Sequence, residues 1–300
     1  MTRVAVIGGG GAAIRACHAA AVRGARVTLI SKGTAAASGC TLAVDSKIEF
    51  SVVNWPMPDP DTASTYAADL QAIGCGLKRP ERLRLFAERS VDEIGLLERH
   101  GVPLKDAGRS RRVQLAGSSY PRGIVCPPRF GARVLQALWA ATRRDRVIPN
   151  LFAAGDVADS VQGADRINGS GIMEALVFGA LGGAGAAEAR ATTRKAPAMP
   201  AAYGRRSPHP SGRLLEWRRR LASVMDEVLV VRDRQRLSRL EPMLSDNLRE
   251  LEDGGLVGET PATTRLLHEL RSTLTTALLV VRASRRREQD LGLFLTTRSR

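Results

Sequence analysis

The first part of the chain alternates short apolar runs with one longer helical stretch. Arg3–Ile7 and Arg26–Ser31 are apolar runs of strand length, and an alanine-rich stretch from about Ala12 to Arg23 separates them. A strand, a helix and a second strand in such a short span form a βαβ unit, whose two strands run parallel. The pattern therefore predicts an α/β region built on a parallel sheet.

Helical spacing of apolar residues returns three times before the middle of the chain. It predicts helices over Asp61–Cys75, over Pro80–His100 and from about Gly131 to Arg143. The stretches 32–62 and 101–129 are rich in small residues or proline, and we expect them to be irregular.

The second half begins with an apolar run, Ile148–Ala154, that ends in Gly155-Asp156. It predicts a buried strand delivering a polar loop, followed by a helix over Gly171–Arg190. Further helices are expected from Arg213, over about Arg236–Glu252 and over about Pro261–Arg287, as a small antiparallel bundle. The predicted organisation is the N-terminal part of an α/β domain (1–146), a second segment of that domain (147–190), a Pro/Ala/Gly-rich linker (191–212) and a helical domain (213–300).

The charge of the chain adds little to this picture. The formal net charge is +15 and nearly all of it is arginine, spread along the chain, while aromatic residues make up only 4%. Nucleic-acid readers interleave basic and aromatic residues, so we interpret this as a solvated basic surface and expect no nucleic-acid partner. No apolar run reaches the length of a membrane span, and the chain enters a strand at once, so we expect a cytoplasmic protein. The four cysteines lack metal-ligand spacing, and no metal site is predicted.

A glycine motif lies between the first strand and the first helix. Gly8-x-Gly10-x-x-Ala13 provides a tight turn, a close backbone approach and close packing of the helix on the strand. The first turn of the helix then offers free N–H groups to a pyrophosphate. Within a βαβ unit this motif predicts a dinucleotide site, and a simple glycine-rich turn is the alternative.

The second strand ends without the acidic residue that usually binds the adenosine ribose. Ser31 and Lys32 stand there instead. A serine hydroxyl can still bond a ribose, and the single lysine is weak support for a bound 2′-phosphate.

Three separated segments together resemble one family. VAVIGGGGAAIRA with TLISKG and ASGCTLAV, NLFAAGDVADSVQGADRINGSGIMEALVFG, and LLHELRSTLTTALLVVRASRRREQDLG occur in the order seen in fumarate reductase, succinate dehydrogenase and L-aspartate oxidase flavoproteins. The resemblance implies a Rossmann-like FAD-binding domain followed by a C-terminal helical domain, with FAD rather than NAD as the cofactor.

The resemblance assigns roles to residues of the N-terminal segment. It implies that the ADP pyrophosphate is held by Gly8, Gly10, Gly11 and Ala13, the ribose by Ser31 and Lys32, and the pyrophosphate loop by Ser38, Gly39, Cys40 and Thr41. Some relatives carry in this loop a histidine that bonds covalently to the flavin. This loop has none, so the resemblance implies non-covalent FAD.

The later segment receives its roles in the same way. Gly155 and Asp156 match the ribityl contact, and Ser170, Gly171 and Ile172 match the helix N-terminus that faces the flavin. Arg166 matches an arginine that grips a substrate carboxylate, for which a guanidinium fork is suited. Arg122 matches a position near the flavin. The alternatives are a turn or helix cap for Asp156 and an ordinary surface arginine for Arg166.

The relatives' long central region, which carries most of a capping domain, has no counterpart at the seam Arg144–Val147. That region supplies the relatives' proton donor and substrate-binding histidine, and none of the four histidines here resembles the latter. Two functions follow from the resemblance. One is an FAD-dependent oxidoreductase that transfers hydride to or from a small carboxylic acid, with an electron-transfer partner subunit. The other is a shortened, catalytically silent homologue with weak or no FAD binding. A basic, non-catalytic binding protein is a third hypothesis.

Overall fold

The computed structural model describes residues 2–44, 48–55, 60–104, 112–126, 128–142, 153–158, 161–189, 200–229, 231–290 and 295–297. The chain divides into two compact units, Met1–Thr193 and Arg194–Arg300. The predicted seam Arg144–Val147 and most of the predicted strand Ile148–Ala154 lie outside the described residues.

The first unit begins with the predicted βαβ arrangement. β1 (Arg3–Ile7) and β2 (Arg26–Ile30) pair in parallel, with Arg3 opposite Arg26 and Ile7 opposite Ile30, and α1 (Gly11–Val22) connects them. Val4 and Val27 are buried at matching positions of the two strands. The α/β prediction with a parallel sheet is therefore confirmed.

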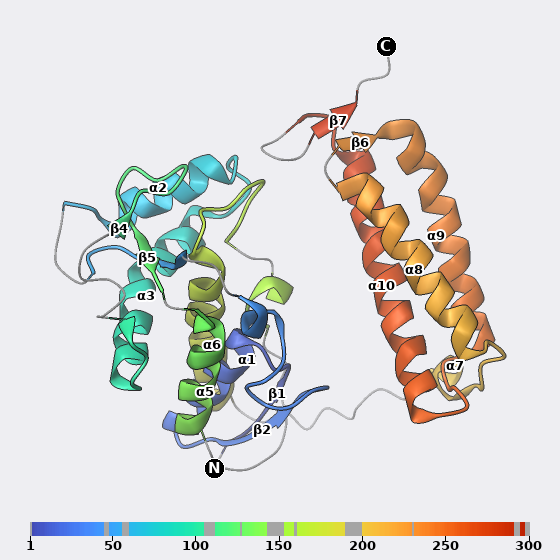
Figure 1. The fold of residues 1–300 in the computed structure, drawn as a ribbon, viewed down its shortest axis with the longest axis horizontal. Helices are drawn as coiled ribbons and strands as arrows, with labels where there is room; N and C mark the ends of the chain where they lie inside the picture. The colour runs from blue at the N-terminus through green and yellow to red at the C-terminus, as the bar shows by residue number, and fades with distance from the viewer. Residues whose placement is uncertain are drawn as a thin grey trace. The chain divides into compact units, whose positions relative to one another are not determined.

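Helix α6 (Ser170–Glu188) packs against α1 in the same unit (Figure 1). Gly179 and Gly183 face α1 so closely that a Cβ added to them would lie 2.5 and 2.2 Å from the carbonyl oxygens of Ala12 and Ala16. Within the described part of the chain, α6 alone is long and apolar enough to cross a membrane, but 61% of its apolar window is buried inside the fold. Its composition is that of a core helix.

The other helices of this unit close its main core. They are α2 (Ala63–Ile73), α3 (Pro80–Arg99) and α5 (Phe130–Thr142), close to the predicted bounds. The Thr62 hydroxyl caps α2 by accepting the Thr65 N–H at 3.0 Å, and Pro80 occupies the first turn of α3. Phe50, Phe86 and Phe130 are fully buried between these elements.

A second sheet forms where the sequence predicts irregular structure. β3 (Ile48–Ser51), β5 (Gly123–Val125) and β4 (Arg112–Val113) pair antiparallel in the order β3-β5-β4. Two short 3₁₀ turns, η1 (Cys40–Ala43) and η2 (Asp156–Ala158), are also present. The prediction of irregular structure over 32–62 and 101–129 is wrong at these strands, because their pairing depends on residues far apart in the sequence.

The second unit is a helical bundle whose long helices lie side by side in Figure 1. It consists of the short α7 (Ala201–Gly204) and the long α8 (Ser211–Leu229), α9 (Arg234–Gly254) and α10 (Pro261–Arg286). Leucines that include Leu214, Leu244 and Leu267 form its core. β6 (Val231–Asp233) and β7 (Leu295–Thr297) add a short parallel pair. The predicted helical domain is present, although α7 and the start of α8 lie inside the predicted linker.

Candidate functional site

The glycine turn between β1 and α1 has the local geometry that its sequence predicts. The Gly8 N–H donates to the Ile30 carbonyl at 2.8 Å, which fixes the turn to the end of β2, and Gly8 has a φ of +133° that favours glycine. Gly10 precedes α1 and, as a glycine, has no side chain that could cap the helix. The first turn of α1 therefore offers N–H groups that an anion can accept.

A cavity of about 950 Å³ lies against this turn. Its wall is formed by residues from β1, the start of α1, η1, the segments 153–157 and 166–169, and one face of α6 from Gly171 to Ala186. The predicted site residues on the wall are Gly8, Gly10, Gly11, Ala13, Cys40, Thr41, Gly155, Arg166, Gly171 and Ile172. Most of the wall is glycine and alanine, and the volume lies in the range of ligand and cofactor pockets.

Residues 38–41 lie directly on the glycine turn. The Thr41 hydroxyl accepts the Gly11 N–H at 2.9 Å, and the hydroxyl oxygens of Ser31 and Ser38 are 3.1 Å apart. A Cβ added to Gly39 would lie 2.7 Å from the Gly10 Cα, so only glycine fits there. Ser31, Lys32, Ser38 and Gly39 thus gather beside the turn, but they are not part of the cavity wall.

A buried polar network fixes the N-terminus of α6. The Glu174 carboxylate accepts the Val161 N–H and the Gln162 amide, both at 3.0 Å. The Ser170 hydroxyl donates to the Ile167 carbonyl at 2.6 Å and lies 3.1 Å from Gln162 Oε1. Because Ser170 is fully buried and its hydroxyl serves this network, a role for it at a flavin rests on its backbone alone.

Arg166 lies on the cavity wall beside the first turn of α6. One terminal guanidinium nitrogen is 3.0 Å from the point that a Cβ on Gly171 would occupy. The side chain is exposed, and the Arg166 backbone N–H donates to Asp165 Oδ1 at 2.7 Å. A guanidinium next to a helix N-terminus makes this end of the cavity attractive to a carboxylate.

Gly155 lies on the wall of the same cavity, and Asp156 follows it in the chain. Gly155 is buried with a φ of +77°, and an added Cβ would lie 3.2 Å from the Ala12 Cβ. Asp156 begins η2. The structure thus brings the backbone of the predicted ribityl-binding pair to α1, and the ribityl contact itself stays a prediction.

Arg122 lies in a buried ionic cluster. Its guanidinium forms a two-point ion pair with Asp61 at 2.6 and 2.7 Å, and a further bond with Asp69 at 2.5 Å. It also lies 4.5 Å from the centre of the Tyr66 ring, and it is fully buried. The side chain holds α2 to the start of β5 and is not part of the cavity wall, and its contact with a flavin stays a prediction.

A buried charged cluster between α1 and α3 was not predicted at all. Arg15 pairs with Glu93 through two bonds of 2.6 and 2.9 Å, and His18 Nδ1 lies 3.2 Å from the same guanidinium. The His18 and His100 rings meet edge to face at 5.0 Å. Burial, aided by Arg15 and His100, lowers the pKa of His18 to about 4. The sequence carries no signal for this contact, because α1 and α3 meet only in the fold.

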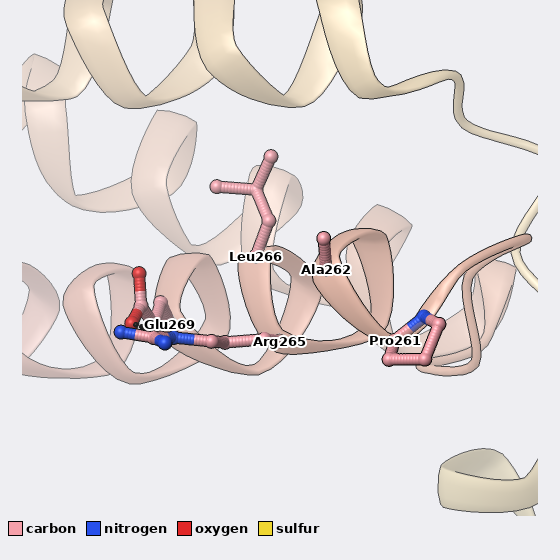
Figure 2. Close-up of a pocket in the computed structure, with 5 residues that line it drawn as sticks. All are labelled: Pro261, Ala262, Arg265, Leu266 and Glu269. Carbon is pink, nitrogen blue, oxygen red and sulfur yellow. Dashed lines mark hydrogen bonds and ion pairs between the residues drawn. The ribbon is translucent and has the colours of Figure 1, made fainter. Parts of the chain in front are cut away.

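A second hollow, of about 510 Å³, lies on the surface of α10 in the bundle. Figure 2 shows its five lining residues, Pro261, Ala262, Arg265, Leu266 and Glu269, all on that helix. Arg265 Nε donates to Glu269 Oε1 at 3.0 Å, so the polar groups of this hollow satisfy each other. The hollow therefore lacks the converging polar groups of a ligand site.

The first half of the chain is similar to a known cofactor-binding family. Residues 3–141 match the family model described as the FAD binding domain. The N-terminal part of this chain is similar to that domain. The match covers β1, α1, β2 and the glycine turn, and together with the fold it indicates FAD as the cofactor. A comparison with curated protein sequences finds no match.

Solved structures show which fold the chain has. The Mycobacterium smegmatis Sdh1 complex in the apo form superposes with a TM-score of 0.80 at 13% identity, covering 99% of this chain and 89% of that chain. A variant of the E. coli quinol fumarate reductase gives a TM-score of 0.77 at 12% identity, covering 99% and 92%. A quinol-fumarate reductase with menaquinol molecules gives 0.79 at 13%, with the same coverage of 99% and 92%. The chain has the fold of succinate dehydrogenase and fumarate reductase flavoprotein subunits.

Proposed function

We propose that this chain is an FAD-dependent oxidoreductase that transfers hydride to or from a small carboxylic acid. The observation that carries the proposal is the large cavity, which joins the glycine turn of an FAD binding domain to Arg166. One end of this cavity suits a dinucleotide and the other suits a carboxylate. We also propose a cytoplasmic location and non-covalent FAD, as the sequence led us to expect.

The residues around the cavity fit FAD. The cavity reaches the first turn of α1, which has no side-chain cap from Gly10. Glycine and alanine walls let the backbone approach a bulky cofactor closely, and first-turn N–H groups bind phosphate oxygens well. Gly8, Gly10 and Gly11 would hold the pyrophosphate, Ser31 and Lys32 the adenosine ribose, and Asp156 the ribityl chain.

FAD supplies the hydride chemistry when it is bound. The chain's own part is to bind and orient the reactants. Arg166 would hold the substrate carboxylate with its planar fork, and the start of α6 at Gly171 and Ile172 adds the positive end of a helix dipole beside it. The Glu174 network keeps residues 161–170 fixed, and therefore keeps Arg166 at the cavity.

A partner subunit that carries electrons is part of this proposal. One of the similar structures is described as the Sdh1 complex and another as a quinol-fumarate reductase with menaquinol. A flavin that has taken hydride from a substrate has to pass its electrons to an acceptor, and one that gives hydride has to receive electrons from a donor. We propose that a separate subunit fills this role here.

The visible absorbance of the purified chain tests the cofactor. We expect flavin absorbance that survives gel filtration, either as purified or after added FAD, and that is released on denaturation. Gly10→Val, which adds a branched side chain at the start of α1, is expected to weaken FAD binding at least about tenfold. Gly212→Ala is the matched control, because a Cβ there meets nothing within 4 Å. A colourless wild-type chain that takes up no added FAD contradicts the proposal.

Turnover separates the proposed enzyme from a silent homologue. The FAD-loaded chain is mixed with fumarate and a reduced dye, or with succinate or aspartate and an oxidised dye. We expect dye turnover that falls at least about tenfold in Arg166→Gln, while FAD absorbance is retained. FAD binding with no turnover of any of the three acids identifies the silent homologue instead.

A further inference from the structure

Four consecutive residues form a strap across the glycine turn: Ser38, Gly39, Cys40 and Thr41. The strap makes three contacts, two with the turn and the start of α1 and one with the residue that follows β2. Thr41 accepts the Gly11 N–H at 2.9 Å, Ser38 meets the Ser31 hydroxyl at 3.1 Å, and Gly39 lies against Gly10. These contacts connect the strap to the start of α1 and to the end of β2.

The strap occupies the space that a pyrophosphate needs. A phosphate oxygen that accepts a first-turn N–H has to lie about 2.9 Å from that nitrogen. At Gly11 the Thr41 hydroxyl already lies there. At Gly10 the strap backbone packs close, since there is no room for a Cβ on Gly39, which would lie 2.8 Å from the Gly10 nitrogen. The same N–H group cannot serve the strap and a phosphate fully at once.

The strap also contacts Ser31, the residue at the expected ribose position. Ser31 follows β2, where a dinucleotide's ribose is usually bound. Its hydroxyl meets Ser38 and accepts the Gly33 N–H at 3.3 Å. The strap residue Ser38 therefore holds the side chain that the adenosine half would use.

The ends of the strap differ in how firmly they are held. At its C-terminal end the backbone packs on the start of α5, where a Cβ on Gly131 would lie 1.9 Å from the Thr41 carbonyl oxygen. Towards the N-terminus, Ala36 is buried in the main core with a φ of +56°, a strained value for a residue with a Cβ, and between it and Thr41 the residues Gly39 and Cys40 are exposed. A strap held this way can lift at its Ser38 end and stay anchored at α5.

We propose that this strap is a gate on the proposed FAD site. It opens to admit the ADP half of FAD, exchanging the Thr41 hydroxyl for a phosphate oxygen at the Gly11 N–H, and then closes over the pyrophosphate. The inference rests on the proposed function, since it concerns entry of the same cofactor to the same site.

A reversible disulfide tests the gate. Ser31→Cys and Ser38→Cys are combined in a Cys40→Ser background, which removes the exposed thiol of the strap. Binding of free FAD is followed by flavin fluorescence, once with the two cysteines joined as a disulfide (the oxidised form) and once with both as thiols (the reduced form). Thiol titration verifies each form of the protein beforehand. The oxidised form is expected to bind FAD at least tenfold more weakly or more slowly than the reduced form, with recovery on reduction. Equal binding in both forms overturns the gate.

The rate of FAD association gives a second and independent test. In Thr41→Val no side-chain hydroxyl is bound to the Gly11 N–H, so an entering phosphate has none to displace. Association of FAD is therefore expected to become severalfold faster. Thr41→Ser keeps the hydroxyl and is the matched control, expected to associate as the wild type does. A Thr41→Val variant that associates at the wild-type rate or more slowly, and only dissociates faster, makes Thr41 a simple contact and overturns the gate.

The two proposals fail in different ways. A wild-type chain that binds no FAD overturns both. A wild-type chain that binds FAD, with oxidised and reduced variants binding equally, overturns the gate alone.

Discussion

At the scale of single residues, Arg122 shows how a charged side chain can be fully taken up by the fold, away from the cavity wall. It is fully buried between Asp61 and Asp69, and the Ser119 N–H and hydroxyl also donate to Asp69, at 2.7 and 2.6 Å. These hydrogen bonds and the Arg122 guanidinium hold the pKa of Asp69 below its usual value, against the effect of burial. The cluster is a satisfied ionic centre of the first unit.

Replacing Arg122 is therefore expected to destabilise the fold. Arg122→Met leaves two carboxylates near one another without their cation, which costs about 3–5 kcal/mol of the free energy of unfolding. Chemical denaturation measures this loss. Arg84→Met is the control, since Arg84 pairs with Glu88 at the surface and is expected to cost at most about 0.5 kcal/mol. An Arg122→Met chain with wild-type stability and altered flavin absorbance contradicts this role.

Residues of the site were predictable to different degrees. Gly8, Gly10 and Ala13 follow from their spacing between a strand and a helix, because a tight turn there needs small residues. The approach of Ser38 and Thr41 to the turn came only from resemblance, and the hydrogen bond from Gly11 to Thr41 has no sequence signal. Contacts between residues thirty positions apart depend on the path of the chain, which local pattern does not record.

At the scale of elements, strong periodic segments were predicted and paired short strands were not. α3 and α10 begin at the predicted prolines and end within one residue of the predicted ends. β4 and β5 have only two and three residues, and Val52 donates to the Arg122 carbonyl from a distant part of the sequence. Such strands are stabilised by their partners, so a pattern within one segment cannot reveal them.

The contact of α1 with α3 is expected to make stability depend on pH. Burial, then the charges of Arg15 and His100, lowers the pKa of His18 to about 4, while an unfolded histidine titrates near 6.5. The pKa of His100 is also lowered, by burial and by Arg99 and Arg15. Between about pH 4 and pH 6.5, His18 is protonated in the unfolded state but not in the folded state. Stability is therefore complete above about pH 6.5 and falls as the pH drops towards 4.

The variant His18→Gln isolates this effect. Its free energy of unfolding is expected to change less over the same pH range, by up to about 3 kcal/mol relative to the wild type. Urea denaturation at a series of pH values measures the difference. Parallel curves for the two proteins across this range show that His18 is not protonated differently in the folded and unfolded states.

At the scale of the whole molecule, the two compact units have separate hydrophobic cores. The first is centred on Phe50, Phe86 and Phe130, and the second on leucines of α8, α9 and α10. The proposed cofactor site lies entirely within the first unit. A ligand stabilises only the part of a protein whose folded state it binds, unless the parts unfold together.

FAD is therefore expected to raise the unfolding temperature of the first unit and leave that of the second unchanged. Of the three tryptophans, Trp55 and Trp139 lie in the first unit and Trp217 in the second. Trp217→Phe makes fluorescence report on the first unit, and the double variant Trp55→Phe/Trp139→Phe makes it report on the second. FAD at a hundredfold excess over its dissociation constant adds about 2.7 kcal/mol to the first unit. An equal shift of both signals shows that the units unfold as one.

The glycine and alanine walls of the cavity also bear on how far such a sequence can diverge. Where the walls are main chain, most positions outside the wall can change by drift without touching the binding surface. Small residues are needed where α6 meets α1, because a Cβ on Gly179 or Gly183 would collide with carbonyl oxygens of α1. A larger side chain at either position would push α6 away from the helix that begins at the glycine turn.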